Sequence, residues 1–423
     1  MLRVGPGRSW RVPMLILTTP VLLALLVGHV QVAGASRARP VAGNPWTVVP
    51  SSDVSPTSAD RLTDVSCPTS TFCASVGMSG STPLVEVYRS RTWSVTPFAD
   101  TSPPTLASLD GVSCSSERFC MAVGDADSSG PYGVVVKVPV AETWNGSTWQ
   151  LIAAPTNPAA SGFEVHDQLS GVSCPTSRFC AATVETEGVT FVDGEPTSVV
   201  RGYAGTWNGS RWSTGAIGNQ PDAVSCSSAS LCVAVGTEGG SGASTITFGG
   251  DAFAATWQGS SWSTVNFALP SGSDNGLSGS TLNAVSCLTS WCLATGTQQL
   301  WTEGPPGTFT PGPTTVVDAV STGSSWSSTL VTTPPVAPSG LACTVAGTCV
   351  GVGQCSSSSC GGSGDALIER LGSGIWSQAV LASPPAAPAL ASVSCGTRAH
   401  CTAVGDHSAP TDRTLVAMGK PVS

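Results

Sequence analysis

The chain has 423 residues, only 10% of them charged, and a formal net charge of −9. About a quarter of residues are charged in ordinary globular domains. Because no lysine-rich or arginine-rich run occurs, the sequence excludes a nucleic-acid groove and a basic surface for anionic membranes. Abundant Gly, Pro, Ser, Thr and Val favour short strands and turns over long helices.

The N-terminal segment has the pattern of an export signal. Three arginines precede an apolar run over 13–27, and Ala33 and Ala35 occupy the small-residue positions of a cleavage site. The alternative is an uncleaved membrane anchor, but the apolar run is shorter than the about 20 residues that cross a bilayer. We predict a cleaved signal peptide over 1–35, a linker over 36–43, and no membrane association after cleavage.

A pair of cysteines recurs along the rest of the chain. "VSCPTSTFC" at 65–73 returns as "VSCSSERFC" at 112–120 and "VSCPTSRFC" at 172–180. A period near 50 residues in a chain of short β-like runs is typical of a β-propeller with one blade per repeat. The seven pairs lie 47 to 61 residues apart: Cys67 with Cys73, Cys114 with Cys120, Cys174 with Cys180, Cys226 with Cys232, Cys287 with Cys292, Cys343 with Cys349, and Cys395 with Cys401.

Each repeat contains four β-like runs. Strand a ends at the first cysteine, strand b begins at the second, strand c is Val-rich, and strand d begins at a tryptophan, as in "WNGSTWQLIAAP" at 144–155. The Asn-Gly pair between strands c and d predicts a type I′ hairpin turn. We therefore expect four antiparallel strands in each blade.

The two ends of the chain predict how the ring closes. The last repeat stops before any strand d, whereas "NPWTVVP" at 44–50 places Trp46 ahead of the first cysteine pair. The N-terminal strand is therefore expected to complete the last blade, which removes the open sheet edges. The prediction is an all-β, seven-bladed propeller over 44–423.

The paired cysteines are predicted to form disulfides. Cross-strand neighbours lie about 4.5–5.5 Å apart, which suits a disulfide between strands a and b of one blade. The spacing fits neither a zinc site nor a Cys-x-x-Cys redox motif. Cys355 and Cys360 lie outside the repeat register and are predicted to close a loop of the sixth blade.

The long connections between strands predict the binding face. The d–a and b–c connections share one face, and those over 156–168, 185–197 and 297–313 are long and unlike one another. Their polar and aromatic residues are the candidate binding groups, namely His166, Asp167, Glu185, Glu187, Asp193, Glu195 and Trp301. The alternative interpretation is that these are solvated loop residues. The repeated tryptophans could stack on sugars, but their presence in every blade favours packing between blades.

Few other motifs indicate chemistry. "DADSSG" gives a weak calcium candidate at Asp125, Asp127 and Ser129, although Val136 stands where an EF-hand loop needs a carboxylate. A carboxylate pair could combine an acid of 185–195 with Asp125 or Asp406. No catalytic elbow, phosphate loop or dinucleotide fingerprint is present, so no cofactor is expected.

The Val-Ser-Cys…Cys-x-Ala-Val-Gly and Trp-Asn-Gly-Ser-x-Trp patterns resemble secreted actinobacterial propeller proteins of largely unassigned role. More distantly the chain is similar to sialidase-like propellers with Asp-box (BNR) repeats, but Asn145-Gly146 stands where the box has its aspartate. A sialidase site would need a tyrosine nucleophile, and Tyr88 and Tyr203 are predicted to lie in strand c, away from the long-connection face.

These observations predict a secreted, monomeric, non-catalytic binding module of the extracellular space or cell wall, with a polysaccharide or protein ligand. The alternative is a glycoside hydrolase or lyase with its site in the central pocket of the long-connection face. A sensor-like envelope protein without ligand chemistry is a third possibility.

Overall fold

The computed structural model describes residues 46–421 with breaks at 56, 99–106, 131–134, 157–162, 193–194, 219, 239–249, 267–277, 306–307, 324, 332–335, 356–364, 373–374, 380, 398–399 and 409–410. The predicted signal peptide and the linker lie outside the described residues. Among the described residues, no helix is long and apolar enough to cross a membrane.

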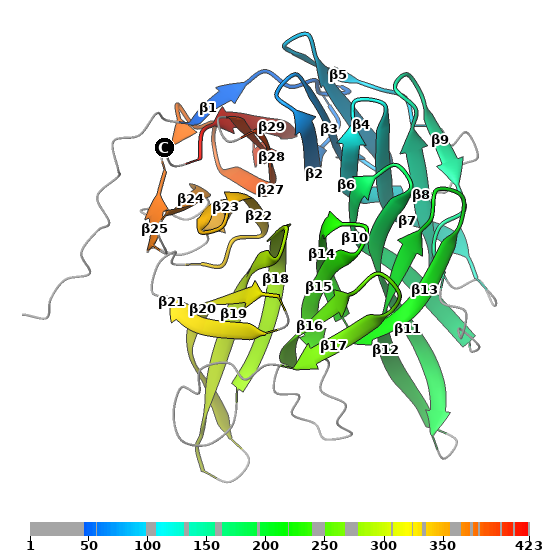
Figure 1. Cartoon of the computed structure of the whole chain (residues 1–423), viewed down its shortest axis with the longest axis vertical. Coiled ribbons are helices and arrows are strands. Elements are labelled where there is room, and N and C mark those ends of the chain that lie inside the picture. Colours follow the sequence, from blue (N-terminus) through cyan, green and yellow to red (C-terminus); the bar gives the residue numbers. More distant parts are fainter. Residues whose placement is uncertain are drawn as a thin grey trace, which may run out of the picture. The chain divides into compact units, whose positions relative to one another are not determined.

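The described chain is all-β, and its strands form seven sheets arranged as the blades of a ring (Figure 1). Blade one comprises β2 (Asp60–Thr69), β3 (Phe72–Ser79), β4 (Thr82–Arg89) and β5 (Thr92–Val95). Blade two comprises β6 (Ala107–Ser116), β7 (Phe119–Ser129), β8 (Val135–Trp144) and β9 (Trp149–Ile152). Blade three comprises β10 (Phe163–Thr176), β11 (Phe179–Val192), β12 (Glu195–Trp207) and β13 (Trp212–Gly218).

The remaining blades repeat this order. Blade four comprises β14 (Gln220–Ser228), β15 (Leu231–Glu238), β16 (Asp251–Trp257) and β17 (Trp262–Asn266). Blade five comprises β18 (Ser278–Leu288), β19 (Trp291–Glu303), β20 (Phe309–Thr322) and β21 (Trp326–Val331). Blade six comprises β22 (Gly340–Val345), β23 (Thr348–Cys355), β24 (Asp365–Gly372) and β25 (Ile375–Gln378). Blade seven comprises β27 (Pro388–Thr397), β28 (His400–Ser408), β29 (Asp412–Gly419) and β1 (Trp46–Val49), with β26 (Leu381–Ala382) beside β1.

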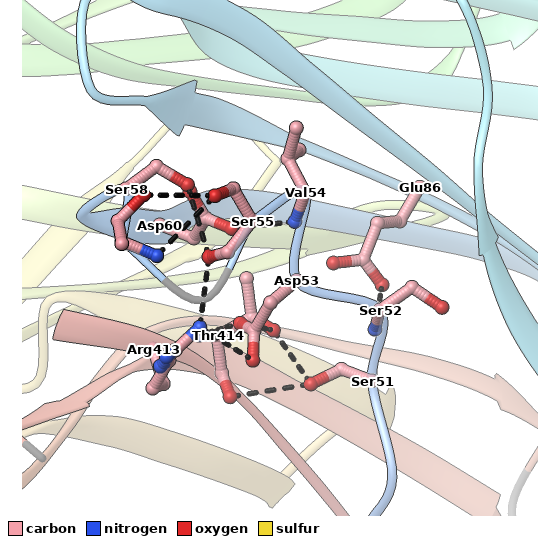
Figure 2. Close-up of polar contacts among 11 residues, drawn as sticks. Ser51, Ser52, Asp53, Val54, Ser55, Ser58, Asp60, Glu86, Arg413 and Thr414 are labelled. Atoms are coloured by element: carbon pink, nitrogen blue, oxygen red, sulfur yellow. Dashed lines mark hydrogen bonds and ion pairs between the residues drawn. The ribbon is translucent and has the colours of Figure 1, made fainter. Parts of the chain in front are cut away.

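The predicted closure of the ring is confirmed. Strand β1 pairs antiparallel with β29, so the two ends of the described chain meet in blade seven (Figure 1). The segment that follows β1 is held by polar contacts at the junction with blade one (Figure 2). Asp53 accepts hydrogen bonds from the backbone and hydroxyl of Thr414, and Glu86 accepts one from the Ser52 amide. The closing strand is therefore anchored by hydrogen bonds on both sides of the junction.

Tryptophans and other apolar side chains pack between neighbouring blades, as predicted. Trp144 and Trp149 of blade two lie in one buried cluster with Phe72 of blade one. Trp207 and Trp212 pack in the same manner with Phe119 of blade two. Burial of these indoles stabilises the contact between blades, which explains their recurrence better than a repeated sugar platform does.

Seven disulfides join strands a and b, and each matches a pair that the repeats predict. The pairing follows from the strand register, in which the two cysteines of a blade face each other across the a–b hairpin, as in blades two, four, five and six. Each blade therefore carries one covalent link next to the turn between its two inner strands. The confirmed pairs are Cys67–Cys73, Cys114–Cys120, Cys174–Cys180, Cys226–Cys232, Cys287–Cys292, Cys343–Cys349 and Cys395–Cys401.

The second cysteine of each pair is the more deeply buried one in several blades. Cys120, Cys180 and Cys349 are fully buried, because each lies one residue inside strand b, where the neighbouring blade covers it. No free cysteine occurs among the described residues. The eighth predicted pair is different: Cys355 ends β23, but Cys360 lies outside the described residues, so the link between them stays a prediction.

Two expectations about the connections are wrong. The Asn-Gly turns are not type I′, because Gly146 and Gly209 take positive φ values of 103° and 96° while Asn145 does not. Instead, the Asn145 side chain accepts hydrogen bonds from the amides of Ser147 and Thr148, which closes a longer loop. The segments expected to be b–c loops are mostly strand, because their Val, Thr and Phe residues extend the β11–β12 and β19–β20 hairpins beyond the other blades (Figure 1).

Candidate functional site

The seven innermost strands surround a central cavity of about 500 Å³. Its wall is built from the residues that precede the first cysteine of each blade, so it repeats around the ring. Four residues before that cysteine, six blades place a polar side chain in the wall and the seventh places an alanine: Thr63, Asp110, Ser170, Asp222, Asn283, Ser339 and Ala391. We call these seven residues the channel ring.

Three members of the channel ring donate hydrogen bonds to the next blade. The hydroxyl of Thr63 donates to the Leu109 carbonyl at 2.6 Å, and that of Ser170 donates to the Pro221 carbonyl at 2.8 Å. Ser339 reaches the carbonyl of Ala391 in the same direction, at 3.1 Å. These hydroxyls hold neighbouring blades together, so their donor protons are already used.

The other polar members, Asp110, Asp222 and Asn283, do not make this contact. An ionised carboxylate cannot donate a hydrogen bond, so it cannot replace a hydroxyl there. Asp110 accepts a hydrogen bond from Ser108 on its own strand, and the Thr281 hydroxyl lies within hydrogen-bond distance of both Asp222 and Asn283. Each of these three side chains can form more than one hydrogen bond, and all three line the cavity.

The surroundings of both aspartates raise their pKa above the usual value of an aspartate. Burial raises the pKa of Asp110 to about 6, and the negative charge of Asp125 adds to this effect. The pKa of Asp222 is also raised to about 6, because protein atoms crowd the carboxyl group and Glu185 lies nearby. Around neutral pH both groups are mostly carboxylates, and below pH 6 they become donors as well as acceptors.

Asp64 also lines the central cavity, but its carboxylate is used in contacts between blades. Asp64 accepts hydrogen bonds from the Val112 amide of blade two at 2.7 Å and from the Ser392 hydroxyl of blade seven at 2.5 Å. The carboxylate thus links three consecutive blades at the centre of the ring. Burial raises its pKa to about 6 although these hydrogen bonds oppose the change.

None of the binding residues expected from the sequence lies in the described wall of the central cavity. Glu185 lies close enough for its charge to act on Asp222, and its own pKa is raised by burial and by Glu187. His166 faces Glu187 across β10 and β11, and its Nδ1 accepts a hydrogen bond from the Lys137 amide. His166, Glu185 and Glu187 are therefore gathered on blade three, outside the channel ring.

The other expected residues are separated from this group. Asp167 is buried and accepts a hydrogen bond from the Thr186 hydroxyl at 2.6 Å, which is a contact within the blade. Trp301 lies on β19 of blade five, opposite Pro311. Asp193 lies outside the described residues, and Glu195 is described only as the first residue of β12.

The residues of the weak calcium candidate lie on a strand instead of a loop. Asp125, Asp127 and Ser129 belong to β7, and the Lys137 ammonium lies 2.6 Å from Asp125 Oδ2 and 3.2 Å from Asp127 Oδ1. A lysine thus occupies the position that a cation would need. No group of three His, Cys, Asp or Glu residues suited to a metal ion occurs in the part of the chain that the structure describes.

The channel ring was missed because sequence reasoning looked for function in the long connections. A signal was available in the six repeats that contain "VSC", since the residue two places before this motif is Thr, Asp, Ser, Asp, Asn or Ala while its surroundings repeat. When one position varies in an otherwise constant repeat, packing between strands does not determine which residue stands there.

Comparisons with known proteins give distant structural similarities. No model of a known protein family matches the chain. No curated protein sequence matches it either. Among solved structures, the RRP9 WD40 repeats align with a TM-score of 0.47 and 12% identity over 90% of this chain and 99% of theirs. The alpha-L-arabinanase of Penicillium chrysogenum, complexed with arabinobiose, aligns with a TM-score of 0.41 and 11% identity over 89% of this chain and 98% of that one.

A lectin gives a similar result. The six-bladed fucose-binding lectin of Aleuria aurantia aligns with a TM-score of 0.36 and 11% identity over 80% of this chain and 99% of that one. The strand order within the described residues defines the architecture directly. Six sheets have four strands in the order of the chain, and the five-stranded sheet of blade seven takes β1 from the N-terminal side, between β29 and β26. The chain is a seven-bladed β-propeller of four-stranded antiparallel blades, closed by its N-terminal strand.

Proposed function

We propose that this protein is a secreted, non-catalytic binding module of the extracellular space or cell wall. It holds a polysaccharide segment in the central cavity, at the channel ring. The observation that carries this proposal is that the polar side chains of the channel ring fall into two groups with different hydrogen bonds. Three hydroxyls donate hydrogen bonds to the next blade. Asp110, Asp222 and Asn283 do not, and they line one cavity with polar atoms that can bind a ligand. A site with a few fixed polar groups in a rigid wall is typical of small-ligand recognition.

The chemistry of the three side chains favours a ligand rich in hydroxyl groups. Carboxylates accept hydrogen bonds and the amide of Asn283 both donates and accepts, so together they match sugar hydroxyls, which do both. The cavity volume of about 500 Å³ lies within the usual range for small-ligand sites, about 300–1,000 Å³. The acidic wall disfavours polyanions such as nucleic acids.

Secretion is supported by the disulfides. Seven described disulfides in one chain are typical of a protein that folds in an oxidising compartment. The predicted signal peptide over 1–35 gives the same location.

A glycoside hydrolase is the second candidate. It is favoured by Asp110 and Asp222, because both have a pKa raised to about 6 and both line the same cavity. A carboxylic acid with a raised pKa is what a general acid in glycoside cleavage requires.

The test is binding of the purified protein to a panel of cell-wall and extracellular polysaccharides. Asp222→Asn keeps the shape of the side chain and removes its charge, and Asn283→Ala removes the amide. Each substitution is expected to weaken binding about tenfold, the loss of a hydrogen bond to a charged or fixed group. Asp251→Asn is the matched control, because Asp251 is an exposed acid at the start of β16 and lies outside the cavity wall. Equal binding by all three variants would contradict the proposed site.

A further inference from the structure

The junction between blades seven and one contains a second cavity, of about 660 Å³, on the face that carries the disulfides. The a–b and c–d turns of blade one and strand residues of blade seven, among them Gly396 and His400, form its described walls. The side chains of Tyr88, Arg91, His400 and Met418 line this cavity.

The aromatic residues at this junction differ from those at two other junctions. At the corresponding place between blades one and two, Phe72 packs with Trp144, and the Arg89 guanidinium lies 4.9 Å and 5.5 Å from the two ring centres. Between blades three and four, Phe179 and Trp257 lie 6.1 Å apart. The repeat places His400 where these blades have Phe72 and Phe179, and Tyr88 where they have Trp144 and Trp257. At this junction both positions hold smaller rings, and both rings line the cavity.

The charge of the cavity wall differs from that of the whole protein. The chain has 26 acidic and 17 basic residues, and its net charge is −9. The described wall contains Arg91, the imidazole of His400 and five hydroxyl-bearing residues in addition to Tyr88, but no acidic residue. Arg91 forms none of the ion pairs within the described part of the chain. A guanidinium that is not neutralised by the protein is suited to an anion from outside.

The backbone at Arg91 is held in an unfavourable conformation. Ser90 and Arg91 form the two-residue turn between β4 and β5 with φ values of 51° and 67°, a region that favours glycine or asparagine. The turns of blades two and three place a glycine in this region. Strained residues persist where the surrounding structure fixes them, and they concentrate at functional sites.

We propose that this seam cavity binds a small organic acid in which a ring carries a carboxylate group. The carboxylate pairs with the Arg91 guanidinium, which offers two parallel N–H donors to a carboxylate. The ring lies against the flat apolar wall of Tyr88 and Met418, and the hydroxyls of Ser70 and Thr402 surround the remaining edge.

The experiment measures binding of benzoate and of glucuronate to the purified full chain with its disulfides intact, by titration calorimetry at millimolar ligand. Glucose is the uncharged comparison. Binding of benzoate alone identifies an aromatic acid, binding of glucuronate alone identifies a sugar acid, and binding of both supports the shared carboxylate chemistry. Binding of neither acid, or glucose binding as well as glucuronate does, would overturn the proposal.

Arg91→Gly is the informative variant, because it removes the guanidinium and places a favoured residue at a positive φ. It is expected to weaken binding of the acid at least about tenfold without lowering the melting temperature. The matched control is Arg211→Ala, an exposed arginine in the c–d turn of blade three, which should bind as the unchanged protein does. Unchanged affinity of Arg91→Gly would overturn the assignment of Arg91. Asp222→Asn tests independence from the channel, and it should leave binding of the acid intact.

Discussion

The backbone amide of Cys114 in blade two donates a hydrogen bond to the hydroxyl of Ser66 in blade one, with 2.9 Å between the two atoms. The same bond joins the cysteine of one blade to the serine of the preceding blade at five further junctions of the described ring, through Ser113, Ser173, Ser225, Ser286 and Ser394. The serine of each "VSC" thus links neighbouring blades, next to the disulfide that links two strands within a blade.

The junction between blades six and seven lacks this hydroxyl, because Ala342 stands where the other blades have serine. Ala342→Ser is therefore expected to supply a seventh hydroxyl acceptor for the Cys395 amide and to raise the free energy of unfolding by up to about 1 kcal/mol. Ser66→Ala should lower it by about the same amount. Chemical denaturation of both variants measures the two effects, and a destabilising Ala342→Ser would contradict this account of the junction.

The disulfides are expected to stabilise each blade separately. Replacing Cys226 and Cys232 together by alanine removes a link between residues six apart. The chain-entropy model gives a loss of about 2 kcal/mol in the free energy of unfolding for so short a loop. Denaturation of the double variant tests this value. Loss of folding altogether would show that the link does more than restrict the unfolded chain.

The ring should open when the closing strand loses its anchor. Trp46 is fully buried in blade seven, and a Cβ added at Gly419 would clash with its indole. Trp46→Ala is expected to cost about 3–5 kcal/mol, as for other buried large side chains. Gly419→Ala should also destabilise the protein. The two changes together should cost less than their sum, because the new methyl group then enters vacated space. Denaturation of the three variants measures this, and additive losses would contradict the direct contact.

The free energy of unfolding should fall as the pH rises toward about 8. Burial, with help from Asp53 and Asp60, raises the pKa of Glu86 from 4.5 to about 8. Between these two values the folded protein binds more protons than the unfolded chain, so stability decreases with increasing pH and levels off above pH 8. Asp64, Asp110 and Asp222 act in the same direction, but their pKa values of about 6 confine their effect to lower pH.

Glu86→Gln isolates this effect, because a neutral amide cannot ionise. The variant should lose most of the decrease in stability between pH 6 and pH 8 that the unchanged protein shows. Denaturation at several pH values measures it, with Glu117→Gln as the control on the exposed a–b turn of blade two. An unchanged slope for Glu86→Gln would show that Glu86 stays ionised in the folded protein.

The sequence predicted the blades better than the site. Cysteine pairs and strand-leading tryptophans report contacts within one repeat, where the spacing of residues along the chain fixes which side chains meet. The bond between Ser66 and Cys114 joins different blades, and the channel ring depends on how all seven inner strands converge. Predicting such contacts requires the distances between repeats in space, and composition and periodicity do not give these distances. The sequence predicted a loop where the β11–β12 hairpin extends, because polar residues there interrupt the pattern of β-branched ones.

The central claim is that the channel binds a polysaccharide without cleaving it. The most direct measurement exposes the purified protein to the polysaccharide panel and records bound protein and released sugar ends in the same sample. The account predicts binding to at least one polymer, no release of new ends, and weaker binding by Asp222→Asn and Asn283→Ala. New sugar ends that disappear in Asp110→Asn or Asp222→Asn would make the protein a glycoside hydrolase. No binding to any polymer would contradict the proposed ligand and direct attention to a protein partner.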